Sequence, residues 1–284
     1  MALKFGVNTQ TWVAGFAPKD YWLIEHAAKL GFDFIELSYG ENETVFDPKV
    51  VKKMLDDNGL ETALCGYLGG DRDITSTDSS VREMGVRYFR NAAETAVMLG
   101  ATRFTGPLYA EIFFGRPMSA EERKAWWDRS VKGMRECAKI CGDHGLTIGI
   151  EPINRFETGF INIAHDAVRY VEEVGSPHLG ILLDTFHMNM EEKKLGAAIR
   201  EAGKHLVHFH ANGNDRGTPG ADHVPWAEVA DALKEVGYSG GVAIESIAPD
   251  DEGLVMGHKL WRPMGPSQDA VASEGLRFLK QLLG

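Results

Sequence analysis

Eight short apolar runs recur along the chain, and each is followed by a polar loop and an amphipathic helical stretch. They begin near Lys4, Phe32, Glu61, Ala101, Leu146, Leu179, His205 and Gly241. This alternation is typical of parallel βαβ units. Eight units in 284 residues give one unit per about 36 residues, the spacing of a (β/α)₈ barrel rather than of an open sheet with fewer strands. No linker or low-complexity segment divides the sequence, so we predict one α/β domain over residues 1–284, a single (β/α)₈ TIM barrel.

Start and stop signals mark the ends of the helical stretches. Residues 80–83 and 119–122 have the form of capping boxes, in which a Ser side chain and a Glu three residues later satisfy exposed backbone N–H groups. A glycine suited to a left-handed helix end follows six of the patterns, at Gly31, Gly59, Gly100, Gly145, Gly175 and Gly237. In the third helix the predicted buried face consists of Met84, Tyr88, Ala92, Ala96 and Leu99.

The chain is acidic, with 30 Lys and Arg residues against 41 Asp and Glu residues and a net charge of −11. Nucleic-acid binders gather Lys and Arg against phosphates, so this balance argues against nucleic acid as a partner. No window holds the roughly 18 apolar residues of a membrane span, and the first residues lack the apolar core of a secretory signal. We therefore expect a cytoplasmic protein that binds no membrane.

The three cysteines, Cys65, Cys137 and Cys141, are few and odd in number, which fits a reducing compartment better than a disulfide framework. Cys137 and Cys141 lie four residues apart in a helical stretch, but no second Cys or His pair is spaced to complete a zinc site. We expect both to be buried thiols.

Four of the predicted strands end in residue types that bind metals. Glu151 follows the apolar run that ends at residue 150, Asp184 follows residue 183, His210 follows residue 209 and Glu245 follows residue 244. In a barrel of this kind the carboxyl ends of the strands meet at one rim, and catalytic groups lie there. Strands five to eight therefore each bring one such side chain to the same place.

Each of these residues also has a structural explanation when taken alone. Glu151 could pair with Arg155, Asp184 could cap the next helix, His210 could be a core histidine, and Glu245 could be a solvated strand-end carboxylate. Together, however, three carboxylates on one buried rim would repel one another unless a cation neutralised them, and the imidazole completes a mixed oxygen and nitrogen site. We predict a divalent ion there, Mn²⁺ by preference, with Co²⁺ or Mg²⁺ as alternatives.

His208 lies two residues before His210, so both side chains point the same way along a strand. His208 could therefore be a further ligand. Because the four strand-end groups already make a plausible set, we expect His208 either to support the ligands from behind or to lie in the barrel interior.

Three segments resemble those of the D-tagatose and D-allulose (psicose) 3-epimerases, a family within the xylose isomerase-like TIM barrels. They are EPINRFE at 151–157, LDTFHMNMEE at 183–192 and Trp261–Arg262, and the resemblance extends over nearly the whole chain. It implies that Glu151, Asp184, His210 and Glu245 bind Mn²⁺ or a similar ion, and that Glu151 and Glu245 also act as acid and base. It further implies a homodimer or homotetramer.

The same resemblance implies a set of sugar contacts. His187 and Arg216 would hold the O1/O2 end of the substrate, with Glu157 supporting them. Without the motifs, His187 would be a histidine at a helix start, and Arg216 and Glu157 would belong to surface salt bridges. Cys65 is expected at the far end of the pocket. The apolar walls are expected from Trp12, Phe113, Phe114 and Trp261.

Departures from the family pattern bear on the substrate. The family often carries His-x-Gly-Glu before the loop arginine, whereas residues 211–215 here read Ala-Asn-Gly-Asn-Asp, without the glutamate. The loops at 108–114 and 247–252 also differ from the usual epimerase sequences. The acidic residues Asp250, Asp251 and Glu252 lie where phosphate-binding barrels offer a glycine-rich loop. We therefore expect a free ketohexose or ketopentose rather than a sugar phosphate.

The predicted activity is ketose 3-epimerisation, in which a carboxylate removes the proton at C3 and the proton returns on the opposite face of an enediolate. The alternatives are a related metal-dependent sugar isomerase, an inosose isomerase or dehydratase, and a lyase acting on 3-keto glycosides. Two further alternatives are a DNA-repair endonuclease, which the charge of −11 disfavours, and a sugar-binding barrel without turnover.

Overall fold

The computed structural model describes residues 3–40, 46–247 and 252–284. Eight parallel strands close into a barrel in chain order, each paired with its sequence neighbours and β1 paired with β8. The strands are β1 Lys4–Asn8, β2 Phe34–Ser38, β3 Glu61–Cys65, β4 Arg103–Gly106, β5 Thr147–Ile150, β6 Leu179–Asp184, β7 Leu206–His210 and β8 Gly241–Ile244. The predicted (β/α)₈ barrel is therefore confirmed.

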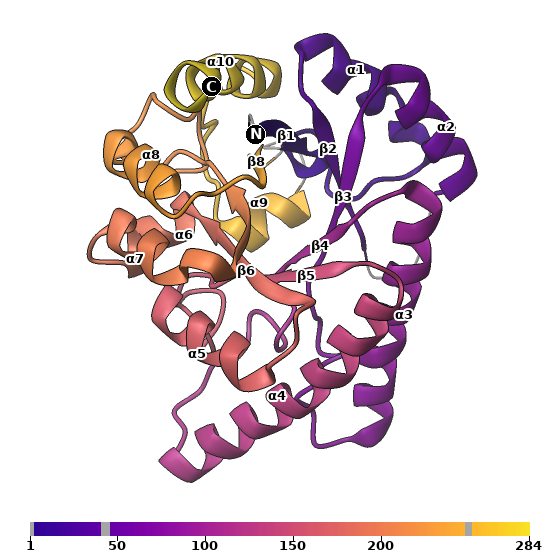
Figure 1. Cartoon of the computed structure of the whole chain (residues 1–284), viewed down its shortest axis with the longest axis vertical. Coiled ribbons are helices and arrows are strands. Elements are labelled where there is room, and N and C mark those ends of the chain that lie inside the picture. The colour runs from indigo at the N-terminus through magenta and orange to yellow at the C-terminus, as the bar shows by residue number, and fades with distance from the viewer. Residues whose placement is uncertain (1–2, 41–45, 248–251) are drawn as a thin grey trace.

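Helices surround the strands as an outer ring (Figure 1). The ring consists of α1 Trp22–Leu30, α2 Pro48–Asn58, α3 Ser79–Leu99, α4 Ala120–Asp143, α5 Ala164–Val174, α7 Leu195–Ala202, α8 Trp226–Glu235 and α10 Gln268–Leu283. Two short helices complete the set: α6 Thr185–Glu191 follows β6 directly, and α9 Glu252–His258 lies between β8 and α10 in the sequence. The 3₁₀ turns are η1 Thr9–Thr11, η2 Pro18–Asp20 and η3 Gly203–His205. None of the helices within the described ranges is long and apolar enough to cross a membrane.

The helix ends follow the sequence signals, with one exception. The six glycines all adopt positive φ angles, from 65° to 92°, and the capping box between Ser119 and Glu122 is present. The box expected at Ser80 is wrong. Helix α3 begins earlier, because the Asp78 carboxylate accepts the Ser80 N–H at 2.8 Å and supplies a stronger, charged cap.

The buried face of α3 also differs at its first turns from the prediction. Tyr88, Ala92, Ala96 and Leu99 are buried as expected, but Met84 is 38% exposed. Gly85 lies at the packed face in its place. The backbone of Arg72 approaches closely there, and a Cβ at residue 85 would lie 2.5 Å from the Arg72 carbonyl oxygen.

Cys137 and Cys141 are buried free thiols on α4, as predicted. Their positions on one helix face place them against the barrel, among the apolar residues of the core. Burial raises the pKa of the Cys141 thiol to about 12. Both side chains therefore act as small apolar groups.

Candidate metal centre and active site

The ends of four consecutive strands bring the predicted ligand residues together. Asp184 and His210 are the last residues of β6 and β7, and Glu151 and Glu245 come directly after β5 and β8. One ligand-type atom from each lies within 4.8 Å of the others, and all four side chains are buried. The pairing of neighbouring strands in register, such as Asp184 opposite His210, sets these side chains at one height in the barrel.

The His210 ring joins the three carboxylates to the barrel interior. Its Nδ1 lies 3.3 Å from Glu245 Oε2 and 3.9 Å from both Glu151 Oε1 and Asp184 Oδ2. On the opposite side of the ring, Nε2 lies 2.9 Å from Glu36 Oε2. His210 Nδ1 and Glu151 Oε1 are buried and have no hydrogen-bond partner. Two such atoms, facing one point beside two more carboxylates, fit the ligand set of a divalent cation.

The charges at this point are out of balance in the protein alone. Burial and the Glu245 carboxylate raise the pKa of Glu151 well above its ordinary value. Burial also works to raise the pKa of Glu245, but His210 and Arg216 outweigh it and hold that pKa at about 2. For His210, burial favours the neutral ring, yet Glu36 and Glu245 raise the pKa well above its ordinary value. The pKa values of Glu151 and His210 therefore both shift toward the protonated form, as expected where negative charge is in excess.

Arg216 lies in the loop after β7 and is buried against two of these carboxylates. Its Nη1 donates to Asp184 Oδ2 at 2.6 Å and to Glu245 Oε2 at 3.0 Å. The guanidinium also stacks on Phe186, 4.2 Å from the ring centroid. The backbone of Arg216 has a φ of 67°, which is uncommon for a residue with a Cβ. This turn directs the side chain back into the barrel mouth, so Arg216 supports two candidate ligands directly.

His187, on α6, is oriented by Asn154. The Asn154 backbone N–H donates to His187 Nδ1 at 3.1 Å, so the neutral ring carries its proton on Nε2. That nitrogen lies 3.6 Å from Glu151 Oε1. Burial and the Arg216 charge lower the pKa of His187 well below its ordinary value, which keeps the ring neutral. Glu157 accepts a hydrogen bond from the Asn154 side chain at 2.8 Å and so supports this arrangement.

A cavity of about 510 Å³ opens beside the cluster. Its lining includes Glu151, Glu157, His187, Arg216 and Glu245, together with Cys65, Phe113 and residues of α9. The Cys65 thiol lies 3.7 Å from Glu245 Oε1, at the end of β3. The cavity is therefore lined by both charged and apolar side chains, and α9 contributes part of the lining.

Two tryptophans expected in the wall lie elsewhere. The Trp12 indole N–H donates to Asp269 at 2.7 Å, and its ring packs edge-on against His26. Because Asp269 belongs to the first turn of α10, this bond directs Trp12 toward that helix.

Trp261 is 66% exposed in the segment that follows α9. Phe114 packs against Trp126. Neither tryptophan lines the cavity, and of this group only Phe113 does.

The structure also answers the structural explanations considered for Glu151 and Asp184 when each was taken alone. Arg155 pairs with Glu191 at 2.9 Å rather than with Glu151. Asp184 does cap α6, through Oδ1, while its other oxygen faces the cluster. The expectation drawn from Asp250 and Asp251 falls outside the described residues.

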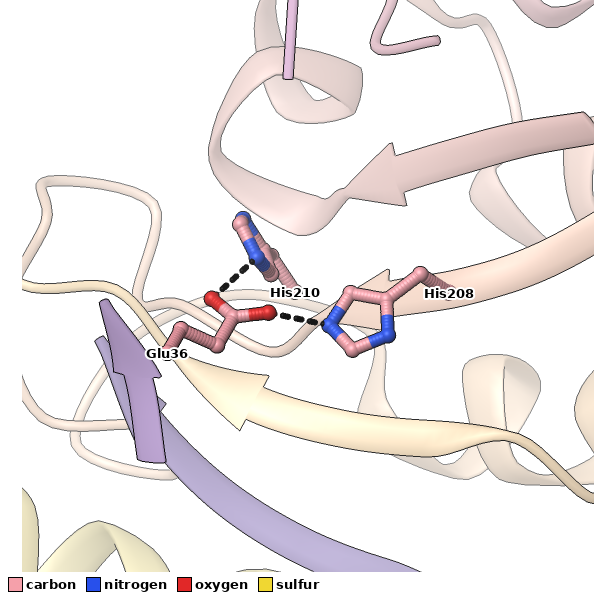
Figure 2. A group of neighbouring side chains, drawn as sticks. All are labelled: Glu36, His208 and His210. Atoms are coloured by element: carbon pink, nitrogen blue, oxygen red, sulfur yellow. Dashed lines mark hydrogen bonds and ion pairs between the residues drawn. The ribbon is translucent and has the colours of Figure 1, made fainter. Parts of the chain in front are cut away.

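Four residues of the site were not predicted. Glu36 lies on β2 between His208 and His210, as Figure 2 shows. Asn8 donates to both Glu36 and Glu245. Asn212 donates to Asp184 Oδ2 at 2.8 Å and accepts the Glu245 N–H at 2.7 Å. His258 on α9 lines the cavity, and its buried Nδ1 has no partner. Only Glu36 had a clear sequence signal, because it is an acid within an apolar strand.

The fold and the site agree with the relationships of the sequence. Residues 24–282 match the family model described as Xylose isomerase-like TIM barrel, and the chain belongs to that family. Within it, the chain is 32% identical over 281 residues to the probable ketose 3-epimerase of Synechocystis sp., covering 98% of this chain and 96% of the relative. It is 31% identical to the D-psicose 3-epimerase of Agrobacterium fabrum, covering 99% and 100%.

A solved structure of this family is also similar to the chain over nearly its whole length. The crystal structure of D-psicose 3-epimerase with D-tagatose from Clostridium cellulolyticum H10 superposes with a TM-score of 0.92. The two chains are 28% identical, and each is covered over 99% of its length. The resemblance to the tagatose and psicose 3-epimerases is therefore confirmed.

Proposed function

We propose that this protein is a ketose 3-epimerase that acts on free ketohexoses or ketopentoses with a divalent cation, Mn²⁺ by preference and Co²⁺ or Mg²⁺ as alternatives. The relatives named above make it an enzyme of the carbohydrate-epimerase type. The observation that supports the chemistry most directly is the convergence of Glu151, Asp184, His210 and Glu245 within 4.8 Å, at the floor of a cavity. We further propose that the protein is cytoplasmic and forms a homodimer or homotetramer. Light scattering of the purified protein would test the oligomeric state.

The cation would be held by the four strand-end residues and would act as a Lewis acid toward the negative charge that develops on adjacent sugar oxygens. Glu151 and Glu245 move the proton in this proposal. They come from β5 and β8, which are three strands apart around the barrel, so their carboxylates reach a bound sugar from different sides. One removes the C3 proton and the other returns a proton to the opposite face.

His187 and Arg216 orient the sugar. His187 Nε2 and Arg216 Nη2 lie 3.0 Å apart at the cavity wall, so both can donate to the oxygens at one end of a ketose. Glu157 and Asn154 hold the His187 ring in the tautomer that donates from Nε2. Holding the reacting carbon at a fixed distance from the carboxylates is what makes the proton transfer efficient.

The charge of the cavity favours a neutral sugar over a sugar phosphate. Glu151, Glu157 and Glu245 line it, whereas Arg216 is already bonded to two carboxylates. A phosphate dianion would meet more negative than positive charge there. Cys65, beside Glu245, and Phe113 would provide apolar contacts for the C–H faces of the sugar.

Proton NMR in D₂O tests the proposal. The Mn²⁺-loaded protein is incubated with a panel of ketopentoses and ketohexoses. We expect exchange of the C3 hydrogen together with formation of the C3 epimer of at least one ketose. Migration of the carbonyl would instead identify an isomerase, and release of a leaving group would identify a dehydratase or lyase. Either of these results, or no turnover of any ketose, would overturn the proposed 3-epimerase activity.

A further inference from the structure

Glu36 is a charged residue in the middle of the barrel. It is the third residue of β2, its exposure is 0%, and it lies among apolar neighbours on its strand. Barrel interiors of this fold are usually filled by branched apolar side chains. Burying a carboxylate costs free energy unless it is paired and hydrogen-bonded. None of the catalytic steps proposed above uses Glu36, so its presence calls for another role.

Two imidazoles (Figure 2) and the Asn8 side-chain amide surround this carboxylate. Glu36 Oε2 lies 2.9 Å from His210 Nε2, and Glu36 Oε1 lies 2.5 Å from His208 Nε2. Asn8 Nδ2 is 3.2 Å from Glu36 Oε2 and 3.2 Å from Glu245 Oε1. The carboxylate therefore connects to two of the four candidate ligands, to His210 directly and to Glu245 through Asn8.

The contact with Glu36 fixes which nitrogen of His210 is free. An ionised carboxylate only accepts hydrogen bonds, so the His210 nitrogen that faces it must carry a proton. The neutral ring then has its lone pair on Nδ1, which is the atom that faces Glu151, Asp184 and Glu245. His208 Nε2 lies 2.5 Å from the other oxygen of Glu36, so the two rings contact both oxygens of the carboxylate and limit its rotation.

Packing holds His208 in place. Its ring meets Phe34 edge-on, with centroids 5.9 Å apart. Space for both rings depends on glycines of the neighbouring strands: a Cβ at Gly241 would lie 2.8 Å from Phe34 and 3.1 Å from His208, and one at Gly6 would lie 2.2 Å from Phe34. The strands around the cluster thus leave room for these side chains and little else.

We propose that Glu36, assisted by His208 and Asn8, is a positioning residue that fixes His210 and Glu245 for cation binding without touching the cation. This inference rests on the metal site of the proposed function. We assign the cluster a positioning role rather than a second metal site, because two ligands at about 2.0–2.2 Å from one ion stay roughly 3 Å or more apart. Glu36 Oε1 and His208 Nε2 are closer than that. Hydrogen-bond partners of metal-binding histidines orient the ring and increase its basicity.

The test measures Mn²⁺ binding to the metal-free protein by the EPR signal of free Mn²⁺, with no sugar present. Glu36→Gln keeps the shape of the side chain but removes its charge and turns an amide N–H toward one of the imidazoles. We expect Mn²⁺ affinity to fall about 10- to 100-fold. Glu36→Asp keeps the charge but is one methylene shorter, so it should restore part of the affinity.

Asp73→Asn is the matched control. Asp73 is also a buried carboxylate, but it bonds to Thr75 in the loop after β3 and is not among the cavity-lining residues. It should lower thermal stability and leave Mn²⁺ affinity unchanged.

Wild-type Mn²⁺ affinity in the folded Glu36→Gln protein would overturn this inference alone, while the metal site would stand. If Glu36→Gln does not fold, wild-type affinity in Glu36→Asp has the same meaning. Failure of the wild-type protein to bind Mn²⁺ would overturn both the inference and the metal-dependent function. Equal losses in Asp73→Asn and Glu36→Gln would also overturn it, since the effect would then follow from any lost buried charge.

Discussion

Replacing Arg216 by Ala removes the one arginine that faces the candidate ligands in the described structure. Nη1 donates to Asp184 Oδ2 at 2.6 Å and to Glu245 Oε2 at 3.0 Å, and the whole guanidinium is buried. Removing one partner of a buried ion pair leaves uncompensated charge and costs about 3–5 kcal/mol. Alanine also has a Cβ, so the strain at a φ of 67° is the same in both proteins and cancels. We expect the metal-free variant to lose about 3–5 kcal/mol of unfolding free energy.

The assay is urea unfolding followed by circular dichroism, in EDTA and in saturating Mn²⁺. The cation should take over part of the neutralisation, so the loss should be smaller with Mn²⁺. Arg200→Ala is the matched control, because Arg200 also bonds an acid through two nitrogens, Glu235 on α8, but the two side chains are 42% and 56% exposed. Exposed pairs contribute about 0–1 kcal/mol. An Arg216→Ala loss no larger than that of Arg200→Ala would refute the reasoning.

Two further predictions concern the site. Glu151→Gln and Glu245→Gln should each abolish C3 exchange in D₂O, because an amide cannot accept the proton, while the circular dichroism spectrum stays that of the wild type. The control Glu173→Gln, on α5, should keep full activity. Turnover in either site variant would rule out the proposed acid–base pair. Burial and the Arg216 charge lower the pKa of His258 to about 4 from an ordinary 6.5. The unfolded ring therefore binds a proton first as the pH falls, and the stability it contributes above pH 6.5 is lost toward pH 4. His258→Gln should flatten the fall of Tm over that interval, and an unchanged slope would contradict the burial of a neutral ring.

The four strand-end residues could be predicted because, in a parallel barrel, the position of a residue along its strand determines its height in the barrel. A residue that ends an apolar run in a parallel barrel lies at the carboxyl rim whatever the loops do. Glu151, Asp184, His210 and Glu245 meet for this reason alone. The positions of loop side chains cannot be predicted in this way. Trp12 and Trp261 lie near the rim in sequence, but Trp12 is bonded to Asp269 and Trp261 points to solvent.

The errors at the helix ends and within the barrel have a different origin. Both Asp78 and Ser80 are good caps, and the sequence does not say which one the chain uses until its contacts with the rest of the fold are known. Met84 and Gly85 exchange places at the packed face because a backbone carbonyl approaches there. Glu36 was not predicted: it is an acid in an apolar strand, but its role depends on His208 and His210, about 170 residues away in the sequence.

The charges around the site explain why the Glu36 cluster and the candidate metal centre belong together. Glu36, Glu151, Asp184 and Glu245 are four buried carboxylates, and Arg216 is the single arginine bonded to any of them in the described ranges. The pKa values of Glu151, Asp184 and His210 are all raised, so the excess of negative charge favours the protonated form of each group. A divalent cation would supply the same positive charge and displace those protons, since ligands must be deprotonated to bind. In the proposed arrangement Glu36 would stay outside the ligand set, and its charge would increase the basicity of His210 toward the cation.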